Sequence, residues 1–152
     1  MIKIVTDSAC DVPEGLTQEY GIIKVPTHII WDGEQYLDSV TMTADEFYRR
    51  LPTTSAIPTS SQPSMGEFRQ AYLDAAVQGA TEIVCLTVSG KLSGTFESAS
   101  NAARESEVPV QVVDSRSISM QQGWQVLAAA RAGQLGASVR QILDAIEEVR
   151  QK

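Results

Sequence analysis

Three short runs of mostly apolar, often β-branched residues, each ending in polar residues, constrain the fold most strongly. They are IKIVTDS (residues 2–8), IVCLTVS (83–89) and VQVVDS (110–115). Near-continuous apolar runs are typical of parallel strands, because helices cover both faces of a parallel sheet. Segments with helical patterns lie between and after these runs. We therefore predict an α/β, Rossmann-like fold with a mostly parallel sheet and helices on both faces.

A longer excursion separates the first two runs. Its sequence, IIKVPTHIIWDGEQYLDSV (residues 22–40), contains Asp32-Gly33 between two extended arms. Asp-Gly is a strong signal for a tight hairpin turn, because such turns need residues that tolerate positive φ. We expect the arms to form antiparallel strands at an edge of the sheet, where Pro26 is tolerated although it lacks an N–H group.

Helix starts are marked by hydroxyl residues. Thr43 and Ser64 each have a glutamate three residues later, which is the spacing of a capping box, and each precedes a segment with helical periodicity. Gly133 and Gly136 are expected to break the chain after QGWQVLAAARA. Ser138 is then expected to begin a last amphipathic helix.

Composition excludes several classes of protein. The 152 residues, 43% of them hydrophobic, suit one domain with a single good core. Acidic residues outnumber basic ones by 19 to 12, for a net charge of −7, which argues against a binder of DNA or RNA phosphates. No apolar run approaches the ~20 residues of a membrane span, so we expect a soluble, cytoplasmic protein. Cys10 and Cys85 are expected to be unpaired thiols, and with one histidine we expect no metal site and no cofactor.

The unusual polar residues follow the predicted strands. Thr6-Asp7-Ser8, residues 89–95 and Asp114-Ser115 each come at the end of an apolar run. Ligands of open α/β sheets bind at the carboxyl ends of the strands. We therefore expect these loops to converge on one site.

Two clusters of hydroxyl residues are the candidates for that site. Ser93-Gly94-Thr95 lies where a helix is predicted to begin, and free N–H groups with the positive end of the helix dipole favour an anion there. Thr59-Ser60-Ser61 precedes Pro63 and another helix start. Each cluster alone is equally explained as an N-cap in a Ser/Thr-rich loop. Two such loops at one sheet edge predict a site for an anion or a carboxylic acid.

An enzyme is the alternative interpretation. Serine catalysis needs a base, and the only histidine, His28, lies in the excursion, where we expect a structural imidazole. Neither a G-x-S-x-G elbow nor a P-loop pattern is present. Asp7, Asp11 and Asp114 could bind magnesium for phosphotransfer or hydrolysis, but aspartates at strand ends also orient loop amides. We expect a binding protein without enzymatic activity.

Four further segments stand out in order along the chain: IVTDSACDVP (residues 4–13), TSSQPS (59–64), LSGTFESA (92–99) and VVDSRSISMQQG (112–123). Together they resemble the successive signature segments of the DegV family, bacterial fatty-acid-binding proteins. The resemblance covers nearly the whole chain and implies a carrier that holds a long-chain fatty acid and presents its carboxylate to a partner fatty acid kinase, for phospholipid synthesis. It also implies that Ser93 contacts the carboxylate and that Ser60 stands at the family's second hydroxyl position.

The chain also departs from the family pattern. Family members usually have threonine in place of Ser60 and glycine in place of Gln121. They also carry a second domain that closes over the lipid, and we expect residues 1–152 to be the N-terminal domain alone. A single domain offers a wall for the acyl chain, so weak binding or a homodimer that covers the groove is expected. The predicted apolar wall residues are Ile29, Ile118, Met120 and Trp124.

Overall fold

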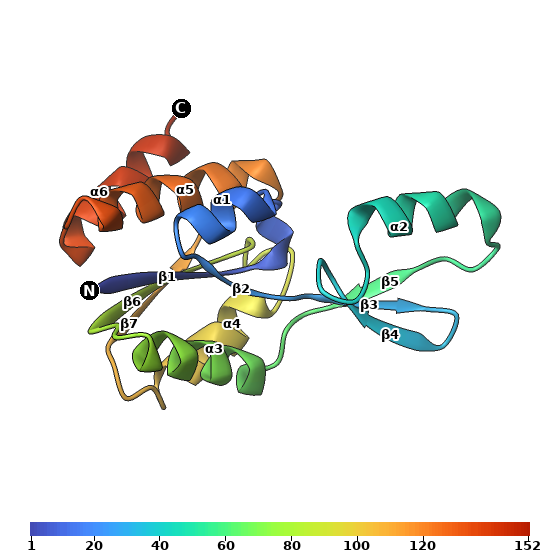
Figure 1. The fold of residues 1–152 in the computed structure, drawn as a ribbon, viewed down its shortest axis with the longest axis horizontal. Coiled ribbons are helices and arrows are strands. Elements are labelled where there is room, and N and C mark those ends of the chain that lie inside the picture. Colours follow the sequence, from blue (N-terminus) through green and yellow to red (C-terminus); the bar gives the residue numbers. More distant parts are fainter.

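The computed structural model describes all of residues 1–152 and contains a four-stranded parallel sheet (Figure 1). The three predicted apolar runs form its three longest strands, which confirms the predicted α/β fold. Backbone hydrogen bonds join neighbouring strands in parallel register, with Ile4 opposite Val84 and Cys85 opposite Val112. The order across the sheet is β2 (Ile23–Val25), β1 (Ile2–Asp7), β6 (Glu82–Thr87) and β7 (Val110–Asp114).

Helices cover both faces of this sheet (Figure 1). Successive strand residues point to opposite faces, so Ile4 packs in one core cluster and Val5 in the other. The first cluster lies under α1 (Glu14–Glu19), α5 (Met120–Gln134) and α6 (Val139–Arg150). The second lies under α3 (Met65–Val77) and α4 (Thr95–Ala103). None of the helices is both long enough and apolar enough to cross a bilayer.

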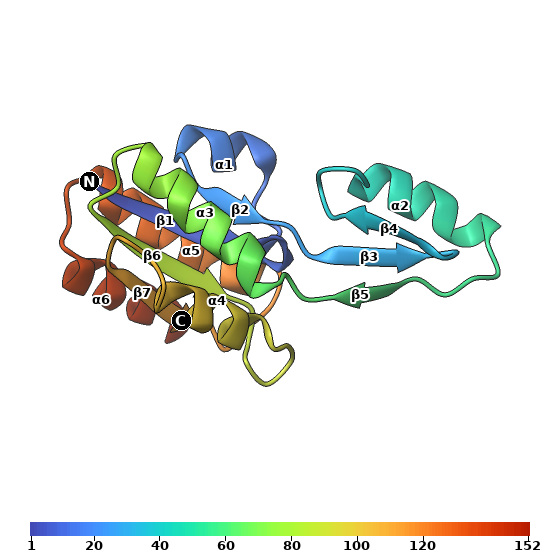
Figure 2. The ribbon, with the colours of Figure 1, turned by 90° about the horizontal axis from the view of Figure 1, so that it is seen from below.

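The antiparallel excursion is confirmed, and it forms a sheet of its own instead of extending the parallel one. Its strands run in the order β4 (Glu34–Leu37), β3 (His28–Trp31) and β5 (Thr59–Ser61), and α2 (Ala44–Arg50) packs on them. We call residues 28–61 the antiparallel lobe, and it projects from the parallel sheet (Figure 2). Pro26 separates β2 from β3 and has no N–H group to continue the parallel ladder.

The lobe has a small aromatic core and a tight turn. Trp31 is buried, and its ring lies 5.0 Å from that of Phe47 on α2. The guanidinium group of Arg50 stacks 4.5 Å from the centre of the Trp31 ring, a cation–π contact. Asp32 and Gly33 have φ of 53° and 77°, as the predicted two-residue hairpin turn requires.

The predicted helix starts are confirmed, whereas one predicted break is wrong. Thr43, Ser64 and Ser138 each cap a helix through the side-chain oxygen, the latter two in complete capping boxes. Gly133 lies within α5, and Gly136, with φ of 79°, follows the helix end. Glycine inside a helix costs about 1 kcal/mol relative to alanine, a cost that the packing of α5 against α6 outweighs. Two 3-10 turns complete the elements: η1 (Ser8–Cys10) and η2 (Leu51–Thr53).

Candidate functional site

The loops at the carboxyl ends of β1, β6 and β7 converge, as predicted. Val88, just after β6, donates its backbone N–H to Oδ2 of Asp7 on β1 at 2.7 Å. Gly90 donates its N–H to Oδ1 of Asp114 on β7 at 3.2 Å. The loop between β6 and α4 is therefore held by a carboxylate on each side.

The first turn of α4 leaves backbone donors free. The N-cap residue is Gly94, which has no side chain to cap the helix. The Oγ atom of Ser93 accepts the N–H of Thr95 at 3.2 Å and lies 2.8 Å from the Thr95 hydroxyl. The N–H groups of Gly94 and Phe96 have no hydrogen-bond partner within the chain. Ser93 does not cap the second or third helical N–H, so this turn keeps the donors that favour an anion.

Gly94 lies in close contact with the side-chain amide of Gln62. A Cβ atom on residue 94 would lie 2.5 Å from Oε1 of Gln62 and 2.7 Å from its Nε2 atom. Nε2 of Gln62 also donates to Oγ of Ser98 on α4 at 3.3 Å. Gln62, which follows β5, thus joins the antiparallel lobe to the start of α4.

A groove of about 650 Å³ lies where these loops meet the lobe. It brings together Ser60, Ser61, Ser93, Gly94, Thr95 and Ile118, all of them predicted from the sequence to contact the ligand. No charged side chain lines the groove. Five lining residues were not predicted, although three of them, Ala9, Gln62 and Leu92, lie within the segments that resemble the family: Ala9, Thr27, Gln62, Val88 and Leu92.

The second hydroxyl cluster lies on an exposed strand. Ser60 pairs with Ile29 across the antiparallel sheet, and all three residues of β5 are exposed. Their hydroxyl groups make no hydrogen bond within the chain. The hydroxyls of Ser60 and Ser61, which line the groove, are therefore free to bind a ligand there.

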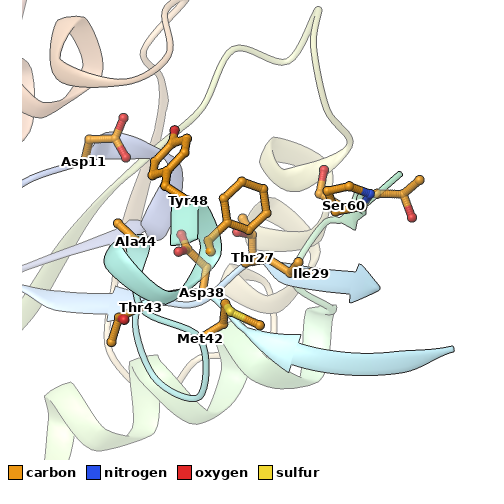
Figure 3. Close-up of a pocket in the computed structure, with 12 residues that line it drawn as sticks. Asp11, Thr27, Ile29, Asp38, Met42, Thr43, Ala44, Tyr48 and Ser60 are labelled. Carbon is orange, nitrogen blue, oxygen red and sulfur yellow. The ribbon is translucent and has the colours of Figure 1, made fainter. Parts of the chain in front are cut away.

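An adjoining pocket of about 550 Å³ lies between β3 and α2 (Figure 3). Thr27 and Ser60 line both cavities, so the polar groove and this pocket are neighbours. The predicted Ile29 and Thr59 line the pocket, whereas Met120 and Trp124 line neither cavity. The other lining residues come mainly from α2 and its flanks and were not predicted: Asp11, Asp38, Met42, Thr43, Ala44, Phe47, Tyr48 and Pro58.

The strand-end aspartates are engaged with backbone amides. Oδ1 of Asp7 accepts the N–H of Ala9 at 3.0 Å, in addition to the bond between Oδ2 and Val88. Burial raises the pKa of Asp7, against the opposing effect of these hydrogen bonds. Oδ1 of Asp114 accepts the N–H of Arg116 at 2.8 Å. No three His, Cys, Asp or Glu side chains gather in a metal-binding arrangement, and the contacts favour the orienting role for these carboxylates.

His28 makes structural contacts, as expected. Its Nε2 atom lies 2.8 Å from Oε1 of Glu67 at the start of α3, and its Nδ1 atom contacts the Gln35 side chain. The imidazole contacts no serine hydroxyl and joins the antiparallel lobe to α3. Cys10 and Cys85 are buried and unpaired, as predicted.

Comparisons with known proteins agree with this architecture. A DegV domain-containing protein of Deinococcus radiodurans is 40% identical over 148 residues, which are 97% of this chain and 52% of the relative. A solved structure of fatty acid binding by a DegV family protein from Thermus thermophilus matches with a TM-score of 0.89 and 36% identity, over 99% of this chain and 54% of the other.

A stearic acid-binding protein from Eubacterium ventriosum has a similar structure, with a TM-score of 0.87 and 29% identity, over 97% of this chain and 52% of the other. The chain thus spans about half the length of the proteins it matches. A family model described as "Uncharacterised protein, DegV family" matches residues 1–152. The chain therefore belongs to the DegV family.

Proposed function

We propose that this chain binds a long-chain fatty acid, with the carboxylate in the polar groove and the acyl chain directed toward the adjoining pocket. One observation carries the proposal. The unpaired N–H of Gly94 and the hydroxyls of Ser93 and Ser60 border a groove that opens beside a pocket lined in part by apolar side chains. The fatty acids bound by the Thermus and Eubacterium relatives support the choice of ligand.

The polar half of the site matches a carboxylate. An ionised carboxyl group only accepts hydrogen bonds, and hydroxyl and N–H groups can all donate. Ser93 and Gly94 supply donors from the α4 turn, where the helix dipole also favours negative charge. Ser60 supplies a donor from the opposite side. The carboxylate is then held by neutral donors, without an ion pair within this chain.

The apolar half of the site matches an acyl chain. Ile29, Met42 and Phe47 line the pocket next to the groove. Each fully buried methylene contributes about 0.8 kcal/mol, so a C16 tail of about fourteen methylenes could contribute on the order of 10 kcal/mol in a closed channel. We also propose that either a second domain or a second copy of this chain covers the acyl tail. Sedimentation with and without palmitate tests for the second copy.

The proposal describes a carrier that offers its ligand to another protein. No nucleophile is paired with a base, since His28 is engaged by Glu67 and Gln35. We propose that a fatty acid kinase acts on the exposed carboxylate. Acyl phosphate should then form only when such a kinase and ATP are added to the loaded carrier.

Titration with palmitate, monitored by displacement of a fluorescent fatty acid, tests the function. We expect saturable binding, and weaker binding of hexadecanol, which has the same chain length without a carboxylate. Equal affinity for both would contradict the proposed carboxylate site. Thermal stabilisation by magnesium with nucleotide, and none by palmitate, would favour the alternative of a metal-dependent phosphotransfer or hydrolytic enzyme.

A further inference from the structure

One buried carboxylate that lies outside the groove holds two residues that line it. Ala9 and Val88 both line the groove, and both donate their backbone N–H to Asp7. Asp7 is fully buried, and Nε2 of Gln122 on α5 lies 3.3 Å from its Oδ1 atom. Each carboxylate oxygen therefore fixes a different part of the groove wall.

A tight turn connects Val88 to the start of α4, so the position of Val88 fixes where the helix begins. The carbonyl of Ser89 accepts the N–H of Leu92 at 2.9 Å and that of Ser93 at 3.2 Å. The Ser89 hydroxyl oxygen accepts the N–H of Lys91 at 3.3 Å. Residues 89–93 thus form a hydrogen-bonded unit between Val88 and the free N–H of Gly94.

We propose that Asp7 is a positioning residue for carboxylate binding. It acts through Val88 and the turn at residues 89–93, and it aligns the Gly94 N–H with the Ser93 hydroxyl. This inference rests on the proposed function for the identity of the ligand. Asp7 is separated from the ligand by Ala9 and Val88. Replacing it should therefore weaken the binding of the carboxylate head group and leave the binding of the acyl tail unchanged.

Asp114 provides a matched control in the same loop system. Its Oδ1 atom alone accepts the N–H groups of Gly90 and Arg116. Asparagine has one acceptor oxygen, so it can reproduce both of these bonds. The same replacement at Asp7 must abandon either Val88 or Ala9, because these two donors bind different oxygens.

Titration of Asp7→Asn and Asp114→Asn with palmitate and with hexadecanol tests the inference. For Asp7→Asn we expect affinity for palmitate to fall about tenfold, while affinity for hexadecanol changes less than about twofold. For Asp114→Asn we expect neither affinity to change more than about twofold. Equal losses for both ligands in Asp7→Asn would indicate a general structural defect and overturn the inference, as would no loss.

Amide hydrogen exchange in the ligand-free proteins gives a readout that is independent of lipid. Asp7→Asn should speed exchange at the hydrogen-bonded amides of Val88, Leu92 and Ser93 about tenfold relative to the β6 amides, and Asp114→Asn should not. Unchanged exchange at these amides would refute the inference even if palmitate binds. Failure of the unmodified chain to bind palmitate would instead refute the proposed function, and exchange would still decide the role of Asp7.

Gln122→Met is the second variant if Asp7→Asn does not fold. It removes one donor to Asp7 and also a buried Oε1 atom that has no hydrogen-bond partner. We expect palmitate affinity to fall about threefold, with hexadecanol affinity unchanged. No selective loss for the acid in this variant would overturn the inference.

Discussion

Ser93 and Ser60 face the same groove from supports of very different kinds. Ser93 is half-buried in a turn where its hydroxyl contacts Thr95, and its N–H binds the carbonyl of Ser89. Ser60 lies on a three-residue exposed strand of the antiparallel lobe, where its side chain makes no hydrogen bond. Similar clusters in the sequence thus become one hydroxyl that is held by a turn and one hydroxyl that has no partner within the chain.

The difference indicates how the two hydroxyls should share the binding energy. A donor that is held in place before binding loses little conformational entropy when the ligand arrives, whereas a free side chain must be ordered. The helix dipole adds to the Ser93 side alone. We therefore expect Ser93 to contribute more than Ser60 to the affinity for the carboxylate.

Ser93→Ala is expected to have the largest effect. A hydrogen bond to a charged group contributes about 1.5–3 kcal/mol, so palmitate affinity should fall roughly ten- to 150-fold. Fluorescent fatty acid displacement measures the affinity, and urea unfolding checks that the fold is retained. An affinity equal to that of the unmodified chain would remove Ser93 from the site.

Ser60→Ala should weaken palmitate binding less, by about two- to tenfold, because water competes for an exposed hydroxyl. Ser55→Ala serves as the control in the same lobe, since Ser55 is exposed and lines neither the pocket nor the groove. If both serines bind one carboxylate, the double variant Ser60→Ala/Ser93→Ala should be non-additive. A larger loss for Ser60→Ala than for Ser93→Ala would reverse the comparison.

The part of the site at the end of the parallel sheet was predictable, because the sequence patterns that indicate it are local. Each apolar run ends in the polar residues that form a loop, and parallel strands bring their ends to one edge. Free N–H groups at the start of α4 follow from the geometry of any helix. The identity of the N-cap residue was not predictable, because Ser93, Gly94 and Thr95 are all compatible with that position.

The part of the site that the antiparallel lobe forms could not be predicted, because it depends on contacts between residues far apart in the sequence. Phe47 reaches the pocket because α2 folds back over β3, and no pattern within either segment specifies that packing. Gln62 resembles any exposed loop glutamine until its contact with Gly94 is seen. Met120 was predicted from its place beside the loop. However, it begins α5, and its sulfur lies against Gly123, 3.1 Å from where a Cβ would be.

The smallest expected effect concerns the contact between His28 and Glu67, which joins the lobe to α3. Burial tends to raise the pKa of Glu67, but hydrogen bonds from Ser64 and His28 outweigh it, so the pKa is lowered overall. Stabilisation from a lowered pKa is present above the unfolded value of about 4.3 and is lost as pH falls through the folded value. Glu67→Gln should therefore reduce stability at neutral pH, and the difference from the unmodified chain should shrink below about pH 4.

The loss in Glu67→Gln should be about 0.5 kcal/mol, because the pair is partly exposed to solvent and glutamine can keep the capping box with Ser64. Urea unfolding at several pH values measures it, and Arg140→Gln, which breaks an exposed pair with Asp144 on α6, is the control. Palmitate binding should weaken at most about twofold, since the hydrogen bond from Gln62 to Ser98 still joins the lobe to α4. If Glu67→Gln weakened binding as much as Ser93→Ala, the position of the lobe would matter as much as the α4 turn, and our ranking of the two hydroxyl clusters would be wrong.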